Sequence, residues 1–262
     1  VGTVQHSNAP KEIHLPENLH IKSGHVTYSA TSGIFKINFH DFIKKDSRIQ
    51  VPILVNDSIP YSVNIDLDQT GFLPQHINVR SSVDKRIDFM NGLWSFQSAD
   101  VYFNSLDIEK NTILSTIQVK KFGGFHPKLS QDFFTIPNAT ADVLIKPDGN
   151  YITLDSSSIF SVNNVSFNLG FGVQPNNRKK FWFHFHLPKS NVQQCLNALP
   201  QTIFPHLRGL KIDGNWEYYL HSDIHSNIAD SNVLISQFDI DDEFKVREWG
   251  VSKIPRMNQS FI

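Results

Sequence analysis

The heptapeptide FWFHFHL, from Phe181 to Leu187, decides the fold class of this chain. Its odd-numbered positions are all apolar, whereas Trp182, His184 and His186 occupy the even-numbered ones. Successive side chains of a β-strand point to opposite faces, so this alternation predicts a half-buried strand with one apolar face. Residues 210–220 return to the same period, which predicts a second strand of this kind.

Residues 190–199, between these two strands, predict one short packed helix. Four apolar positions recur at the helical period: Val192, Cys195, Leu196 and Leu199. Ser190 and Gln193 have the spacing of a capping box at its start. Cys195 is the only cysteine of the chain, so no internal disulfide forms, and its place on the apolar stripe predicts a small buried side chain.

The rest of the chain predicts strands separated by turns. Alternating apolar and polar residues occupy positions 25–29, 34–39, 61–67 and 165–169, and Gly, Pro and Asn cluster between such segments. We expect a mainly β fold, either an extended antiparallel sheet or a sandwich of many strands. The glycines at 123–124 and at 170 and 172 are interpreted as bulges or turns.

Two β-rich regions and a terminal linker are the predicted organisation. The first region covers residues 1–131, and the second covers residues 132–250 and contains the helix. Residues 251–262 have little periodicity and are expected to lead into a missing downstream domain. One continuous β domain across position 132 remains an alternative.

Charge and hydropathy exclude several functional classes. The net charge is −1 and the longest basic run is the triplet at 178–180, which argues against nucleic-acid binding. No apolar run approaches the roughly 18 residues of a membrane-spanning helix. The first residues do not resemble a signal peptide, but the chain does not begin with Met, so an upstream anchor or export signal stays an expectation.

A phenylalanine-rich strand face is the first candidate site. We expect Phe167, Phe171, Phe181, Phe183 and Phe185 to share one apolar face. One short helix is too small to cover such a face. A second sheet would make it an ordinary core, whereas an open sheet would make it a groove for lipid or another apolar ligand.

Histidines on the opposite face are the second candidate site. His184 and His186 lie two residues apart, about 7 Å along a strand, and His221, Asp223 and His225 alternate on the second strand, so they also share one face. Four imidazoles could ligate a metal ion, as in a metal-dependent hydrolase. The alternative is that these histidines face solvent or pack on neighbours.

No other motif points to catalysis or to a cofactor. Gly-x-Ser-x-Gly and a phosphate-binding glycine loop are both missing from the sequence. The acidic run at 239–243 is expected to be a solvated loop rather than a pair of glycosidase carboxylates.

Residues 187–200, which include the Gln- and Cys-bearing helix, and the Leu-x-Gly-Leu-x-Ile-x-Gly segment at 207–214 carry a family resemblance. They resemble the AsmA-like, β-rich periplasmic region that precedes the family 51 glycosyltransferase domain of bacterial peptidoglycan transglycosylase-like proteins. Residues 254–262 are similar to the lead-in to that enzyme domain.

The resemblance implies a non-catalytic spacer or interaction region of a cell-envelope protein, located in the periplasm and anchored through a missing upstream helix. Cell-wall precursors, lipid or envelope proteins are the implied partners. The glycosyltransferase pattern itself does not occur in this chain, so the resemblance assigns no catalytic residue and no cofactor. Two alternatives remain: an AsmA-like groove for lipid, and the histidine-based hydrolase.

Overall fold

The computed structural model describes residues 16–30, 33–89, 91–130, 132–174, 177–207, 209–225, 233–240 and 245–248. The predicted mainly β fold with one short α-helix is confirmed. In chain order, the described elements are β1 (Asn18–Ala30), β2 (Gly33–Lys45), β3 (Arg48–Val55), β4 (Ile59–Leu67), β5 (Pro74–Ser81), β6 (Ile87–Phe89), β7 (Gly92–Ser95), β8 (Ser98–Asp107), β9 (Thr112–Phe125), β10 (Phe134–Asp148), β11 (Tyr151–Leu154), β12 (Ile159–Val162), β13 (Val165–Gln174), β14 (Asn177–Asn191), α1 (Val192–Ala198), the 3-10 helix η1 (Pro205–Leu207), β15 (Lys211–Asp213), β16 (Asn215–His225), β17 (Val233–Ile240) and β18 (Lys245–Glu248).

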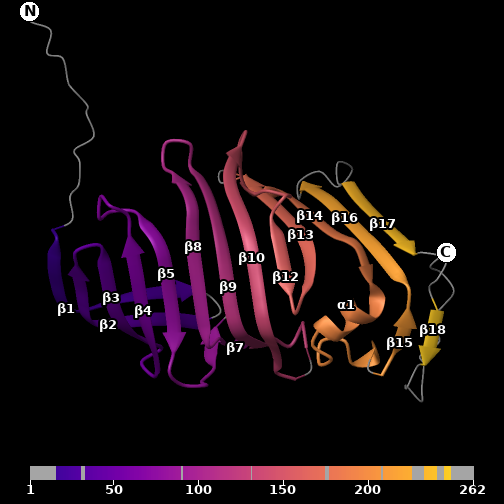
Figure 1. Ribbon diagram of the computed structural model, residues 1–262, viewed down its shortest axis with the longest axis horizontal. Helices are drawn as coiled ribbons and strands as arrows, with labels where there is room; N and C mark the ends of the chain where they lie inside the picture. The colour runs from indigo at the N-terminus through magenta and orange to yellow at the C-terminus, as the bar shows by residue number, and fades with distance from the viewer. Residues whose placement is uncertain are drawn as a thin grey trace, which may run out of the picture.

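One antiparallel sheet contains sixteen of the described strands (Figure 1). Its main path is β1-β2-β3-β4-β5-β8-β9-β10-β11-β13-β14-β16-β17, while β12 pairs with β10 and β13, and the β6–β7 hairpin attaches to β9. Most neighbours in the sheet are also close neighbours in the chain, as expected for short connections between antiparallel strands. The strands β15 and β18 form a separate small sheet.

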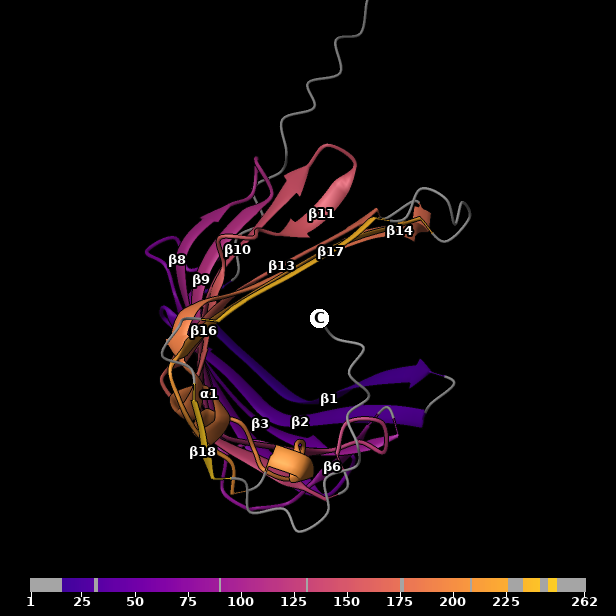
Figure 2. The same cartoon turned by 90° about the vertical axis from the view of Figure 1, so that its right-hand side faces the viewer.

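The backbone of the sheet is bent into the outline of a letter C (Figure 2). Irregular pairing helps to bend it: register shifts occur between Phe39 and Ile43 in β2, between Phe103 and Ser105 in β8, and between Leu187 and Ser190 in β14. Asp41, inside the first shift, has a φ of 50°. Such bulges add a residue to one strand and increase its local bend and twist.

The direction of the bend follows from a hydrophobic cluster between β6 and the strands β2, β3 and β4. Ile87 of β6 packs with the buried side chains of Val55, Ile59 and Tyr61 from β3 and β4. The ring of Phe89 lies 5.3 Å from that of Phe35 on β2. Since β2 and β6 are not neighbours in the sheet, these contacts require it to curl toward the face that carries these residues. That face is therefore concave.

The helix α1 closes the lower end of β14 and β16. Val192 is buried against Leu210 and Ile212, and Cys195 is buried as predicted. The predicted cap at Ser190 is wrong: Asn191 is the N-cap, and its side chain accepts a hydrogen bond from the Gln194 amide. Leu199, expected on the buried stripe, is exposed because the helix ends at Ala198.

The interpretation of the glycine pairs as bulges or turns is also wrong. Gly123 and Gly124 lie inside β9, and Gly170 and Gly172 lie inside β13. Trp182 of β14 lies directly over Gly170 and Gly172, where a Cβ at Gly172 would collide with its indole ring. These glycines provide room for aromatic rings on the sheet surface.

The sheet continues across position 132, because β9 and β10 pair over most of their length. Residues 251–262, predicted to form a linker, lie outside the described residues. Within the described part of the chain, no helix is long and apolar enough to cross a bilayer.

Replacing Gly172 by Ala should lower the free energy of unfolding by roughly 1–3 kcal/mol, because the added methyl group displaces the ring of Trp182. Urea denaturation followed by circular dichroism measures this change. Combining Gly172→Ala with Trp182→Leu removes the ring and should add little further loss. A single variant as stable as the wild type would contradict this account of the glycine.

Candidate functional site: an apolar trough

The register of the sheet places apolar side chains on one continuous face. Directly opposite residues of antiparallel neighbours lie on the same face, so one face can be followed from strand to strand. We call the concave face the apolar trough. Its members include Val26, Ile37, Phe39, Ile53, Val63, Ile77, Val101, Ile117, Val143, Ile145, Leu154, Phe167, Phe171, Phe183, Phe185, Leu220 and Leu234.

Among the described residues, the β6–β7 hairpin covers the trough near β2–β4, where Val55, Ile59 and Tyr61 are buried, and no second sheet lies over the rest. The main path of the sheet contains thirteen strands, and twelve spacings of about 4.8 Å make the trough about 58 Å long. Apolar side chains stay accessible along it, with Val26 60% exposed at one end, Phe171 40% exposed further along, and Leu234 73% exposed at the other end. The second sheet of a sandwich, one of the two arrangements that the sequence allowed, is therefore not found in this part of the chain.

Polar groups in the trough include serine hydroxyls and the phenols of Tyr61 and Tyr218, which lie opposite Ile53 and Leu187. Ser115 lies opposite Val143, and Ser222 lies opposite Phe183. Lys44 lies opposite Ile49 on the same face, but its side chain is buried at the upper rim. Its Nζ donates hydrogen bonds to the carbonyl oxygens of Pro16 and Asp46, 3.0 and 2.9 Å away. The lysine charge is thus held by backbone oxygens rather than presented to the trough.

The five phenylalanines predicted to form a binding face lie together in the trough. Phe171 is directly opposite Phe183. The rings of Phe167 and Phe185 are 5.3 Å apart, and those of Phe171 and Phe181 are 6.3 Å apart. Their shared face is as expected, and their role in ligand binding stays a prediction.

The histidines predicted to ligate a metal lie on the convex face. His184 is directly opposite His221, with ring centroids 6.3 Å apart. Burial lowers the pKa of His184, and the neighbouring His221 and His186 lower it further. His186 instead contacts Glu217, with 2.7 Å between Nε2 and Oε1.

A complete metal site is not found in this cluster. The backbone of His225 belongs to β16, but its side chain lies outside the described residues. In the part of the chain that is described, no three His, Cys, Asp or Glu side chains are grouped so that they could hold a metal ion. Asp239 is placed on β17 rather than in a loop, and residues 241–244 lie outside the described part.

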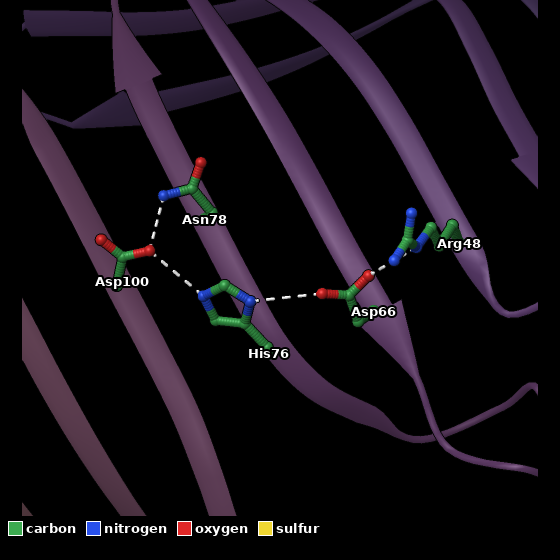
Figure 3. Close-up of polar contacts among 5 residues, drawn as sticks. All are labelled: Arg48, Asp66, His76, Asn78 and Asp100. Carbon is green, nitrogen blue, oxygen red and sulfur yellow. Dashed lines mark hydrogen bonds and ion pairs between the residues drawn. The ribbon is translucent and has the colours of Figure 1, made fainter.

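Sequence reasoning missed a polar network on the convex face of β3, β4, β5 and β8 (Figure 3). His76 lies between two carboxylates, with Nδ1 3.3 Å from Asp66 Oδ2 and Nε2 3.1 Å from Asp100 Oδ1. The Asn78 amide donates to Asp100 at 2.6 Å, and Arg48 Nε lies 3.2 Å from Asp66 Oδ1. The alternation of His76 and Asn78 was visible in the sequence, but their partners on other strands were not.

The network ties four strands together through side chains. The His76 ring also stacks on Tyr102, with ring centroids 4.3 Å apart and an interplanar angle of 3°. Because both ring nitrogens meet carboxylate oxygens, the protonated imidazole can donate to both partners. A structural role on the outside of the sheet accounts for all these contacts.

A second polar contact fixes the turn between β11 and β12. Lys146 Nζ lies 2.6 Å from Asp155 Oδ2, and Asp155 also accepts hydrogen bonds from the amide and hydroxyl of Ser157. The hydrogen bond from Lys146, followed by those from Ser157, lowers the pKa of Asp155 to about 2.

Comparison with known proteins gives no relative: no family model, curated protein or solved structure matches this chain. The function has to be inferred from the geometry of the sheet.

Replacing His76 by Ala should lower the free energy of unfolding by about 1–2 kcal/mol, because two carboxylates lose their partner and Tyr102 loses its stacking contact. Urea denaturation at pH 7 measures the loss. His25→Ala, at an exposed position of β1, is the control and should change stability by less than about 0.5 kcal/mol. Equal stability of the two variants would exclude a stabilising network.

The low pKa of Asp155 predicts a pH-dependent contribution to stability. The native state holds the carboxylate charged, so its contribution is present above the unfolded-state pKa of about 4 and is lost as pH falls toward 2. At pH 6, the free energy of unfolding of the wild type should exceed that of Asp155→Asn by about 1 kcal/mol, after allowance for solvent screening. Urea denaturation of both proteins from pH 6 to pH 2 checks whether this difference shrinks; a constant difference would contradict the assignment.

Proposed function

We propose that the chain binds the long apolar chains of lipids in the apolar trough and serves as a lipid carrier or conduit. One observation carries this proposal: apolar side chains line the concave face across the thirteen strands of the main path, and among the described residues no second sheet covers that face outside the β6–β7 hairpin. This agrees with the lipid-groove alternative raised by the sequence.

The energetics of the trough favour an apolar occupant. Each Å² of apolar surface removed from water contributes roughly 25 cal/mol, and monomeric proteins seldom expose a contiguous apolar patch above a few hundred Å². The accessible apolar side chains of the trough, such as Val26, Phe171 and Leu234, would contribute this free energy when an apolar chain covers them. Lipid chains need contact area and no hydrogen bonds, and they can follow a curved surface.

The chemistry of the lining supports alkyl chains over polar ligands. Its polar members include the hydroxyls of Ser115, Ser222, Tyr61 and Tyr218, and the charge of Lys44 is held by backbone carbonyls at the rim. A sugar or nucleotide would need several directional donors and acceptors inside the trough. Burial of a lipid chain leaves its polar headgroup to be solvated at the rim.

Other functions raised by the sequence have less structural support. The spacer role in a peptidoglycan glycosyltransferase-like protein, the periplasmic location and the upstream membrane anchor stay predictions. A metal-dependent hydrolase would need three or more ligands grouped around one ion, and the described residues contain no such group.

Fluorescent fatty acids of increasing length test the proposal. Each additional methylene group buried in the trough should strengthen binding by up to about 0.8 kcal/mol, so affinity should rise steadily with chain length. Equilibrium titration by fluorescence measures it, and native mass spectrometry gives the number of bound molecules. No binding at any chain length would refute the proposal.

A matched pair of variants locates the binding face. Phe171 lies in the trough and is 40% exposed, whereas Ile159 points to the convex face and is 45% exposed. Phe171→Asn should weaken fatty-acid binding by about tenfold, through loss of roughly 1.4 kcal/mol of apolar contact, and Ile159→Asn should leave it unchanged. If the two substitutions change fatty-acid affinity equally, the binding site does not lie in the trough.

A further inference from the structure

Two loops at the lower edge of the sheet in Figure 1 expose large apolar side chains. Residues 126–133 connect β9 to β10, and residues 199–210 connect α1 to β15. Leu129 of the first loop is 55% exposed, and Phe204 of the second is 43% exposed, with Leu199 exposed beside it. We call Leu129, Leu199 and Phe204 the lower-edge patch.

The two loops belong to one surface. Pro127 and Leu129 of the first loop and Ile203 and Pro205 of the second line a common hollow of about 540 Å³. Leu199 and Phe204 line a second hollow, of about 210 Å³, on the other side of the second loop. Apolar side chains therefore extend from β9 to the end of α1.

Backbone hydrogen bonds hold these loops in a succession of turns. The Leu129 and Ser130 amides donate to the His126 carbonyl at 2.8 and 3.1 Å. In the second loop, Ile203 donates to Pro200 at 3.0 Å. The apolar tips are thus presented outward by ordered turns, each with its own hydrogen bond.

Lysines line both hollows, while the exposed Asp132 of the first loop lines neither. Lys128 lines the larger hollow, Lys211 lines the smaller one, and both lysines are exposed. Neither hollow has Asp or Glu among its described lining residues. An apolar surface with lysines around it fits the interface of a bilayer that contains anionic lipids.

The upper edge differs in this respect. Ile108 is 59% exposed at the β8–β9 turn, but Asp107 and Glu109 flank it in the sequence. Phe72 is exposed at the β4–β5 turn, where its amide donates a hydrogen bond to Asp68. Carboxylates beside the apolar tips are unfavourable near an anionic membrane surface.

We propose that the lower-edge patch docks on anionic bilayers, with Leu129, Leu199 and Phe204 entering the interface. This inference rests on the proposed lipid-binding function, because it places the lower ends of the trough strands β9 and β10 against a source or acceptor of lipid. Docking would let a chain pass between bilayer and trough with little exposure to water.

Vesicle flotation tests the docking surface. The purified chain should float with vesicles of phosphatidylcholine in which roughly one third of the lipid is the anionic phosphatidylglycerol. It should bind phosphatidylcholine vesicles several-fold less, and binding to the anionic vesicles should fall as salt screens the lysines. The double variant Leu129→Ser/Phe204→Ser should bind about tenfold more weakly than the wild type, since both apolar tips are lost.

Ile108→Ser, with an equally exposed apolar residue removed at the opposite edge, is the matched control and should bind vesicles like the wild type. Fatty-acid titration without vesicles, on the same preparations, should be unchanged in all variants. Wild-type protein that does not bind vesicles, or a double variant that binds as well as the wild type, overturns the docking proposal. If vesicle binding fails in one of these ways but fatty acids still bind, only the docking proposal is refuted. If the wild type does not bind fatty acids, the proposed lipid-binding function is refuted separately.

Discussion

Alternation of apolar and polar side chains, kept in step across the antiparallel sheet, is the constraint on which the rest of the structure depends. A slip of one residue in any pair would turn the apolar set of that strand toward the convex face. The observed register avoids this: Phe171 is opposite Phe183 on one face of the sheet, while His184 is opposite His221 on the other. Trough, polar network and curvature all presuppose this agreement between neighbours.

Much of this arrangement could be predicted from short stretches of sequence. The odd and even positions of 181–187 fix the two faces of β14, and the same reasoning places Phe167 and Phe171 of β13 on the apolar one. The helix was visible in its apolar period, although Asn191 and not Ser190 caps it. Periodicity is a local property, so the sequence of one strand is enough to assign its two faces, even when its neighbours in the sheet are unknown.

Features that depend on distant residues could not be predicted in this way. The packing of Ile87 against Val55 needs the sheet to bend, and the bend needs bulges such as the one at Asp41. His76 receives its partners from β4 and β8, so its role follows only from strand order. The glycines of β13 were misinterpreted because the indole that lies over them comes from β14.

A single bent layer also changes how the molecule holds together. Outside the contact of β6 with β2 and the packing around α1, each described strand is supported mainly by the strands on either side of it. Stability then resembles that of a linear array, in which free energy is a sum of neighbour terms and order at one end is weakly coupled to order at the other. The β1–β5 end and the β13–β17 end can therefore fray separately, and an occupant lying along the trough would connect strands that the protein itself leaves nearly independent.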